Sequence, residues 1–322
     1  MRAFLIRRLL QAIPILLGVT ALTFLLLQLA PGDVLSQFSQ NPTIAAETLD
    51  SMRHRFGLDR PWYVQYLLYL RNVALRLDFG ESFTRHQPVF AVIREGLGNT
   101  LLLSGAAALI TWGLAIPLGA WAAARRGRRV DRLLTALASV GLAVPELLSG
   151  LLLLLIAART GWFPVGGMHE AGWERLGWWA RGVDVLRHLA LPALVVGLVP
   201  LAARMRQMRA QLLDTLHQDY ITAARARGLS ETRVLFRHAL RNALNPMITL
   251  FGLTLGALVS GSFVAEVVFS WPGLGRITME ALLAEDRYLV MGAVLMSTVV
   301  LTAGNLVADL LLAVAEPRLR DG

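Results

Sequence analysis

The chain has 322 residues, 55% of them hydrophobic, and a formal net charge of +9 at pH 7. Because the mean hydropathy is +0.55 and several apolar runs exceed the ~18 residues that mark a membrane-spanning helix, the composition excludes a soluble globular protein. The sequence has no cysteine, which excludes disulfides, thiolate metal sites and cysteine nucleophiles.

The first apolar run, residues 9–30, follows three arginines and predicts a retained membrane helix. It is longer than the apolar core of a cleaved signal peptide and ends without a small-residue cleavage site. Residues 31–98 form a long polar segment that we expect outside the membrane. Within it, residues 62–77 have apolar side chains at helical spacing, with aromatic residues suited to a membrane boundary. This segment either contacts a receptor or solute or is a generic surface helix, and both interpretations stay open.

Five further spans are predicted, the fourth run continuing as a helix through Arg204: 100–124, 133–158, 189–203, 243–268 and 288–315. The loop at 125–132 carries five arginines, which marks it as cytoplasmic. All 31 basic residues are arginines and they gather beside the spans, where topology accounts for them without nucleic acid. The sequence therefore predicts an all-α polytopic membrane protein with six transmembrane helices and both termini in the cytoplasm.

The polar stretch 214–246 separates the fourth and fifth spans and predicts two short helices. The first should end at Gly228, since glycine readily takes the left-handed conformation that follows a helix. Ser230 is a candidate N-cap for the second, which would carry Arg233, Arg237 and Arg241 on one face. Two interpretations are possible: the stretch docks on another protein, or it lies on anionic lipid as an amphipathic helix. The helix stop and the second helix favour docking.

The string YITAARARGLSETRVLFRHALRNAL, residues 220–244, resembles the EAA loop of ABC-importer permeases, in the form found in their peptide-transporter branch. Thr222 stands where the general motif has Glu and Arg241 where it has Pro, and the peptide branch departs in the same way. In that family the loop is a helix that docks in a groove on the ATPase subunit. The resemblance therefore implies a coupling role for Tyr220, Thr222, Ala223, Ala224, Arg225, Ala226, Arg227, Gly228 and Leu229.

Other strings extend this resemblance over nearly the whole chain: GLDRPW at 57–62, FSWPGLGR at 269–276 and NLVADLLLAVAEPRLR at 305–320. Together they resemble the B-type permeases of dipeptide, oligopeptide, glutathione or nickel importers. The resemblance implies a type I ABC importer permease fold in the inner membrane. It also implies a homologous second permease, two ATPase subunits that hold ATP and Mg, and an external solute-binding protein. No cofactor is expected in this chain, and the solute stays open.

Four polar residues at membrane depth are candidates for the translocation path, because charge there is costly and usually faces a cavity or partner: Glu146, Glu266, Asn305 and Asp309. The alternative is hydrogen bonding between helices, which we favour for the last two and weigh evenly for Glu146. Arg204 is the nearest candidate cation for Glu146. An external turn after the fifth span is expected from Trp271, Pro272, Gly273 and Gly275.

The sequence lacks the common motifs of enzymes and phosphate-binding loops, and without lysine a Gly-Lys phosphate loop cannot form. The leading interpretation is thus a non-catalytic permease subunit without a metal site, whose ATPase is another chain. The alternatives are an ATP-independent secondary transporter or channel, and a membrane-embedded enzyme. The expected organisation is a first helix and external segment at 1–98, a permease core at 99–315 with a coupling loop at about 214–241, and a cytoplasmic tail at 316–322.

Overall fold

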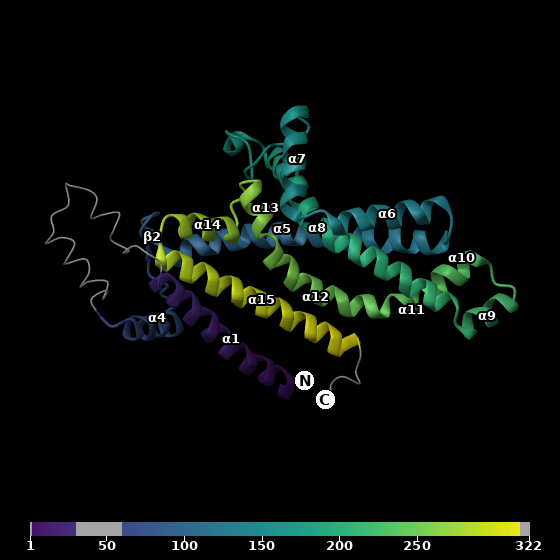
Figure 1. The fold of residues 1–322 in the computed structure, drawn as a ribbon, viewed down its shortest axis with the longest axis horizontal. Coiled ribbons are helices and arrows are strands. Elements are labelled where there is room, and N and C mark those ends of the chain that lie inside the picture. Colours follow the sequence, from purple (N-terminus) through teal and green to yellow (C-terminus); the bar gives the residue numbers. More distant parts are fainter. Residues whose placement is uncertain (1, 30–59, 316–322) are drawn as a thin grey trace. The chain divides into compact units, whose positions relative to one another are not determined.

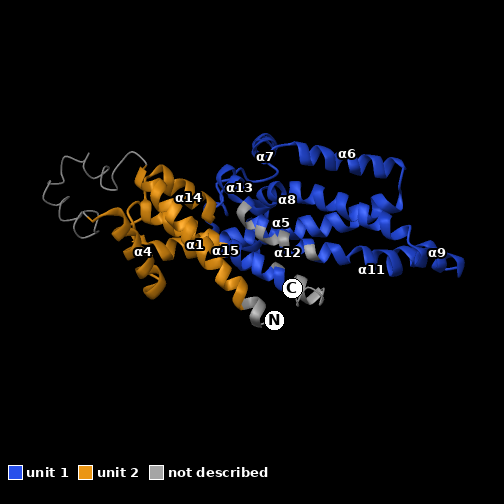
Figure 2. Ribbon diagram, turned by 60° about the horizontal axis from the view of Figure 1, so that its bottom comes forward, with its two compact units in different colours: residues 1, 99–272, 300–322 blue, residues 2–98, 273–299 orange. Residues whose placement is uncertain are grey.

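The computed structural model describes residues 2–29 and 60–315. Over these residues the structure is helical, apart from two short strands, β1 (Glu81–Ser82) and β2 (Gln87–Pro88), which pair antiparallel as a hairpin. The chain divides into two compact units, and each is described by itself (Figure 2). Unit 1 comprises residues 99–272 and 300–322, and unit 2 comprises residues 2–98 and 273–299.

Unit 2 is built on apolar side chains from helices that are far apart in sequence. Its elements are the hairpin, the start of α5 (Val89–Ala124), the start of α15 (Arg287–Ala315), and the helices α1 (Arg2–Leu29), α4 (Trp62–Arg76) and α14 (Leu274–Leu283). Phe79, Ile93, Leu274 and Leu289 lie in one buried cluster. The predicted helix over 62–77 is confirmed as α4. The external segment was expected at residues 31–98. Its first part falls within residues 30–59, which lie outside the described residues.

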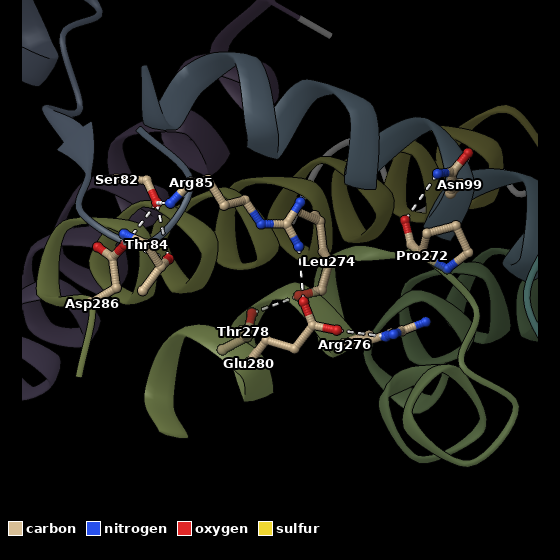
Figure 3. Close-up of polar contacts among 10 residues, drawn as sticks. All are labelled: Ser82, Thr84, Arg85, Asn99, Pro272, Leu274, Arg276, Thr278, Glu280 and Asp286. Atoms are coloured by element: carbon tan, nitrogen blue, oxygen red, sulfur yellow. Dashed lines mark hydrogen bonds and ion pairs between the residues drawn. The ribbon is translucent and has the colours of Figure 1, made fainter. Parts of the chain in front are cut away.

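A buried carboxylate ties the hairpin to the start of α15 (Figure 3). Asp286 is 1% exposed and accepts hydrogen bonds from Ser82 Oγ at 2.6 Å, Thr84 Oγ1 at 3.0 Å and Thr84 N–H at 3.1 Å. Its other oxygen accepts the backbone N–H of Leu289 at 3.1 Å. These hydrogen bonds hold the hairpin against the start of α15.

Unit 1 holds the long central helix α8, which packs against α6, α7, α12 and α13 (Figure 1). The helices of this unit, besides the remainders of α5 and α15, are α6 (Arg129–Ala143), α7 (Glu146–Thr160), the 3-10 turn η1 (Trp173–Arg175), α8 (Trp178–Leu216), α9 (Asp219–Ala226), α10 (Glu231–Arg233), the π-helical turn η2 (Val234–Ala239), α11 (Leu240–Ala243), α12 (Asn245–Gly261) and α13 (Phe263–Val268).

Small residues allow α5 and α8 to approach closely. Thr111 Oγ1 donates to the Gly197 carbonyl at 3.2 Å, and Gly119 lies against the backbone of Met205. Close backbone approach through small residues, with hydroxyl groups bonding across the contact, is the usual way in which membrane helices associate. The contact makes these two spans a packed pair within unit 1.

Valine at Gly119 should force α5 away from α8. A Cβ at this position would stand 2.6 Å from the Met205 carbonyl oxygen and 2.8 Å from Met208 Cβ. We expect a stability loss of about 2–3 kcal/mol, measured as a lower melting temperature of the purified protein. Gly113→Val on the same helix is the matched control, because a Cβ there meets nothing within 4 Å. Equal melting temperatures for the two variants would contradict the packing role.

The predicted spans agree with the structure at four places. Residues 9–29 lie in α1, 100–124 in α5, 189–203 in α8 and 288–315 in α15. The fourth helix continues through Arg204, as expected, and ends at Leu216. Within the described residues, four helices are long and apolar enough to cross a membrane, or five if the bent pair α6 and α7 is one span.

The third and fifth spans differ from the expectation of continuous helices. Between α6 and α7 the chain bends by 105° at Val144 and Pro145. Proline cannot continue the hydrogen bonding of α6, and it holds Val144 in an extended conformation (φ −84°, ψ 121°). Glu146 therefore begins α7, directly after the bend, and does not lie inside a continuous helix. The fifth span is also divided, because α12 ends at Gly261 and α13 begins at Phe263.

Candidate functional site

The polar stretch 214–246 includes α9, which follows the end of α8 after two residues. The helix ends in a Schellman motif: Gly228 N–H donates to the Arg225 carbonyl at 2.9 Å and Leu229 N–H to the Ala224 carbonyl at 3.4 Å. Gly228 has φ +78°, the left-handed conformation that this motif requires. The predicted helix end at Gly228 is confirmed.

The second helix is present but contains a π-helical turn, which the sequence did not predict. After α10 the turn η2 runs from Val234 to Ala239 and leads into α11. Because a π-turn bonds residues five apart, Val234 and Ala239 can share one face, and both are fully buried. Ser230 has the extended backbone of an N-cap, but its side chain makes no capping hydrogen bond. The three arginines predicted for the outer face are exposed: Arg233, Arg237 and Arg241.

Both short helices pack against the C-terminal end of α8. Ile221 and Ala224 of α9 are buried in one cluster with Val234 and Ala239, over Met208 and Leu212 of α8. The opposite face of α9 is solvent-exposed, and the exposed residues of the helix are Asp219, Tyr220, Thr222, Ala223, Arg225 and Ala226. Arg227, which follows the helix, is exposed as well. The apolar side of α9 thus contacts protein, so it is not available to lie on lipid as the amphipathic-helix interpretation required.

Two polar contacts join α9 to the segment that follows it. Asn242 Nδ2 donates to the Tyr220 hydroxyl at 2.7 Å, and Arg225 Nε lies 2.9 Å from Glu231 Oε1. The ion pair is exposed, with 41% and 72% of the two side chains accessible, so its net contribution is at most about 1 kcal/mol. The apolar side chains buried between α9 and α8 therefore fix the position of α9 more firmly than these two surface contacts do.

A second ion pair ties the arginine-rich loop to α8. Arg209 Nε lies 2.6 Å from Asp131 Oδ1, and Arg209 Nη2 donates to Oδ2 at 2.9 Å, which makes a bidentate pair. Gly127 N–H also donates to Oδ2 at 2.9 Å, and the Asp131 side chain is 5% exposed. The pair joins residues that are 78 positions apart, and the sequence pattern did not predict it. Its signal was present, because Asp131 is the single acidic residue among the five arginines of 125–132.

The polar residues predicted for the spans have different surroundings. Glu146 is half-buried, and its Oε1 is buried without a hydrogen-bond partner in the described part of the chain. Arg204 is not its partner: Nε of Arg204 donates to Thr254 Oγ1 at 3.2 Å and Nη1 to Gln207 Oε1 at 3.0 Å. Asn305 and Asp309 lie one turn apart in α15, and Asn305 is exposed.

Glu266 lies in a fully enclosed polar contact near the external turn. Its Oε1 accepts Thr100 Oγ1 at 2.7 Å and Ser262 Oγ at 2.9 Å, and the residue is 0% exposed. Trp271 is equally buried, and its Nε1 donates to the Asn99 carbonyl at 2.9 Å.

The external turn has a different geometry from the one expected. Asn99 Nδ2 bonds the Pro272 carbonyl at 2.9 Å (Figure 3). Gly273 is extended at the start of α14, and Gly275 is helical. The residue with positive φ is Ser270, at +53°, so the turn does not rely on its glycines for left-handed geometry.

The family models match almost the whole chain. The model of the binding-protein-dependent transport system inner membrane component covers residues 115–321, and the model of the N-terminal part of the same membrane component covers 1–104. The chain belongs to the binding-protein-dependent transport system inner membrane component family. This confirms the resemblance drawn from the EAA-like loop and its companion strings. It also confirms a membrane location and a non-catalytic subunit.

Relatives in this family match end to end. The chain is 40% identical to the "Oligopeptide transport system permease protein AppB" of Bacillus subtilis (strain 168), over 99% of both chains. It is 37% identical to the "Di/tripeptide transport system permease protein DppB" of Pseudomonas aeruginosa (strain UCBPP-PA14) and 35% identical to the "Dipeptide transport system permease protein DppB" of Escherichia coli (strain K12), again over 99% of each chain.

A solved structure shares the fold of this inner membrane component. A chain from "Inward facing conformations of the MetNI methionine ABC transporter: CY5 native crystal form" superposes with a TM-score of 0.50 and 19% identity. It covers 69% of this chain and 97% of that chain. At this identity the likeness concerns the fold alone.

Proposed function

We propose that the chain is the permease subunit of an ATP-binding-cassette importer and forms half of the translocation path for a peptide-like solute. Its proposed partners are a homologous second permease, two ATPase subunits that bind ATP and Mg, and an external solute-binding protein. The chain would cross the inner membrane six times, with both termini in the cytoplasm. The names of its end-to-end relatives, which are oligopeptide and dipeptide permeases, support the solute class.

The observation that carries the coupling role is the construction of α9. Its apolar side is buried on α8, its end is fixed by Gly228, and its outer face presents small side chains such as Thr222 and Ala223. Small residues on a rigid helix allow a partner's groove to approach its backbone closely. A secondary carrier has no need of such a surface on its cytoplasmic side, so this feature favours ATP-driven transport over the carrier alternative.

Reconstitution tests the proposal. The chain is co-expressed with its companion permease and ATPases, purified, and placed in liposomes with the solute-binding protein and a peptide library. We expect uptake of peptide that requires ATP and the ATPase subunits, and ATP hydrolysis that is stimulated by the loaded binding protein. Uptake by the chain alone without ATP would favour the carrier alternative and contradict the proposal.

Glu146→Gln should distinguish a role in the path from a role in packing. The buried Oε1 of Glu146 has no partner among the described residues, so the amide removes a charge without breaking a contact seen within the chain. We expect normal assembly but altered transport or altered pH dependence of transport, measured as uptake per assembled complex.

The matched control is Glu266→Gln, in which the carboxylate oxygen accepts two hydrogen bonds within the chain. This variant should lower the melting temperature of the complex, because it alters a buried hydrogen-bonded contact. If Glu146→Gln behaves in the same way as this control, the path role of Glu146 is wrong.

A further inference from the structure

A hollow of about 510 Å³ lies beside α9, on the surface that the proposed function assigns to ATPase docking. It is open to solvent. Its lining comes from α9, the π-helical turn, α11 and the first residue of α12, and consists of Tyr220, Arg237, His238, Arg241, Asn242 and Asn245. Two guanidinium groups and an imidazole line this space, and none of the lining residues is acidic. The hollow is therefore suited to an anionic group.

The two arginines of the hollow differ from others in the same part of the chain. Arg209 is paired with Asp131, and Arg225 with Glu231. Among the described residues, no carboxylate lies within ion-pair distance of Arg237 or Arg241. They are four residues apart and both exposed. Two neighbouring cations that repel each other and have no counterion in their own chain are a costly arrangement unless another molecule supplies the anion.

The walls of the hollow are held in place. Asn242, one of the lining residues, bonds the hydroxyl of Tyr220, so α9 and α11 are joined across it at 2.7 Å. Ala239 and Ala243, which flank Arg241, are buried to 0% and 1% exposure in the cluster over α8. The backbone that carries the arginines is thus fixed, and only their side chains have to adjust on binding. A preformed site of this kind keeps the entropic cost of binding low.

We propose that this hollow receives an acidic side chain of the ATPase subunit when α9 docks. The inference rests on the proposed function, because it takes the ATPase as the occupant. Tyr220 belongs both to the exposed face of α9 and to the hollow, so a partner that covers α9 also covers the hollow. The guanidinium fork of arginine binds a carboxylate with two parallel hydrogen bonds, which adds geometric specificity to the contact.

An exposed aromatic side chain supports a protein occupant. Phe236 is 61% exposed and immediately precedes Arg237. Aromatic residues and arginine are enriched where proteins meet, while lysine and acidic residues are depleted. An exposed phenylalanine beside two unpaired arginines has the composition of such a contact. The carboxylate of the ATPase would neutralise the charge of Arg237 and Arg241, and the ATPase surface around it would cover Phe236.

The test uses the whole complex in membranes and a double variant, Arg237→Gln with Arg241→Gln. Both side chains are exposed, so folding should be unaffected, and the melting temperature of the permease checks this. We expect the ATPase subunits to bind the variant about tenfold more weakly, with a smaller dependence on salt, because a charge-assisted contact is lost. The matched control is Arg233→Gln, which removes an exposed arginine of the same helical stretch that does not line the hollow.

The binding measurements decide whether an acidic side chain of the ATPase occupies the hollow. If the double variant binds the ATPase as tightly as the unmodified complex, or if Arg233→Gln weakens binding equally, the inference is overturned. If the double variant loses affinity in vesicles that contain phosphatidylglycerol but not in pure phosphatidylcholine, the occupant is a lipid headgroup and the inference is also overturned. Reversal of one acidic residue in the ATPase groove to arginine, with recovery by Arg241→Glu, would support it. Failure of the unmodified chain to bind any ATPase would instead refute the proposed function, which keeps the two failures apart.

Discussion

Replacing Gly228 with valine is expected to abolish coupling while leaving the protein in the membrane. The residue has φ +78°, and a β-branched side chain is strained in that conformation by roughly 1–2 kcal/mol or more. Relief of this strain requires the backbone after Arg227 to rotate, which breaks the hydrogen bonds from Gly228 and Leu229 that close α9. The second helix would then leave its place over α8, and α9 would no longer present one fixed surface.

The measurement is ATP hydrolysis stimulated by solute, together with uptake, in the reconstituted complex. We expect both to fall at least about tenfold, with normal amounts of permease in the membrane. Gly161→Val is the matched control, since Gly161 has φ +66° at the end of α7 and, as at Gly228, an added Cβ meets nothing within 4 Å. It carries the same strain away from the coupling surface. Normal transport-linked hydrolysis in Gly228→Val would refute the role of this turn.

Removal of the Asp131 carboxylate should destabilise unit 1 strongly. The side chain is 5% exposed and holds both Arg209 and the Gly127 N–H. Asp131→Ala leaves a guanidinium without its partner at a site where 27% of the arginine side chain reaches solvent, and we expect a cost of about 3 kcal/mol. The loop 125–132 should also become accessible to proteases in inside-out vesicles.

Two companion variants make this prediction sharper. Glu231→Gln breaks the exposed pair with Arg225 and should lower the free energy of unfolding by less than about 1 kcal/mol. The comparison shows how much of the loss in Asp131→Ala comes from the burial of the pair and how much from removing a charge. Arg209→Gln combined with Asp131→Asn should recover part of the loss, because no unpaired charge remains. The melting temperature of the purified complex measures the stability of each variant. If Asp131→Ala and Glu231→Gln lower it equally, the buried pair contributes no more to stability than the exposed one.

Features that depend on local chemistry could be predicted from the sequence. Long apolar runs require membrane helices, and an isolated glycine after an apolar helical pattern is typical of a helix end, which is why Gly228 was placed correctly. The exposed arginines of the second helix followed from their spacing of four. In each case the interacting residues are close together in the sequence, so the interaction can be predicted from the sequence.

The bend between α6 and α7 shows what local chemistry cannot decide. Pro145 coincides with the bend of 105°, yet Pro14, Pro117, Pro192 and Pro200 lie inside helices that continue through them. A proline removes the same hydrogen bond in every helix, and neighbouring side chains determine whether the helix tolerates the loss. The π-helical turn and the Asp131–Arg209 pair have the same origin. Each depends on packing against α8, whose residues are distant in sequence.

The length of α8 has a mechanical consequence. Its 39 residues make a rod of about 58 Å, and α9 is attached to its C-terminal end by only His217 and Gln218. A tilt of about ten degrees around the middle of such a rod would move α9 by roughly 5 Å. Because Pro192 and Pro200 each remove one hydrogen bond, the rod is most compliant there and stiff from Leu201 onward. A force applied to α9 would therefore bend α8 mainly in the region of Pro192 and Pro200.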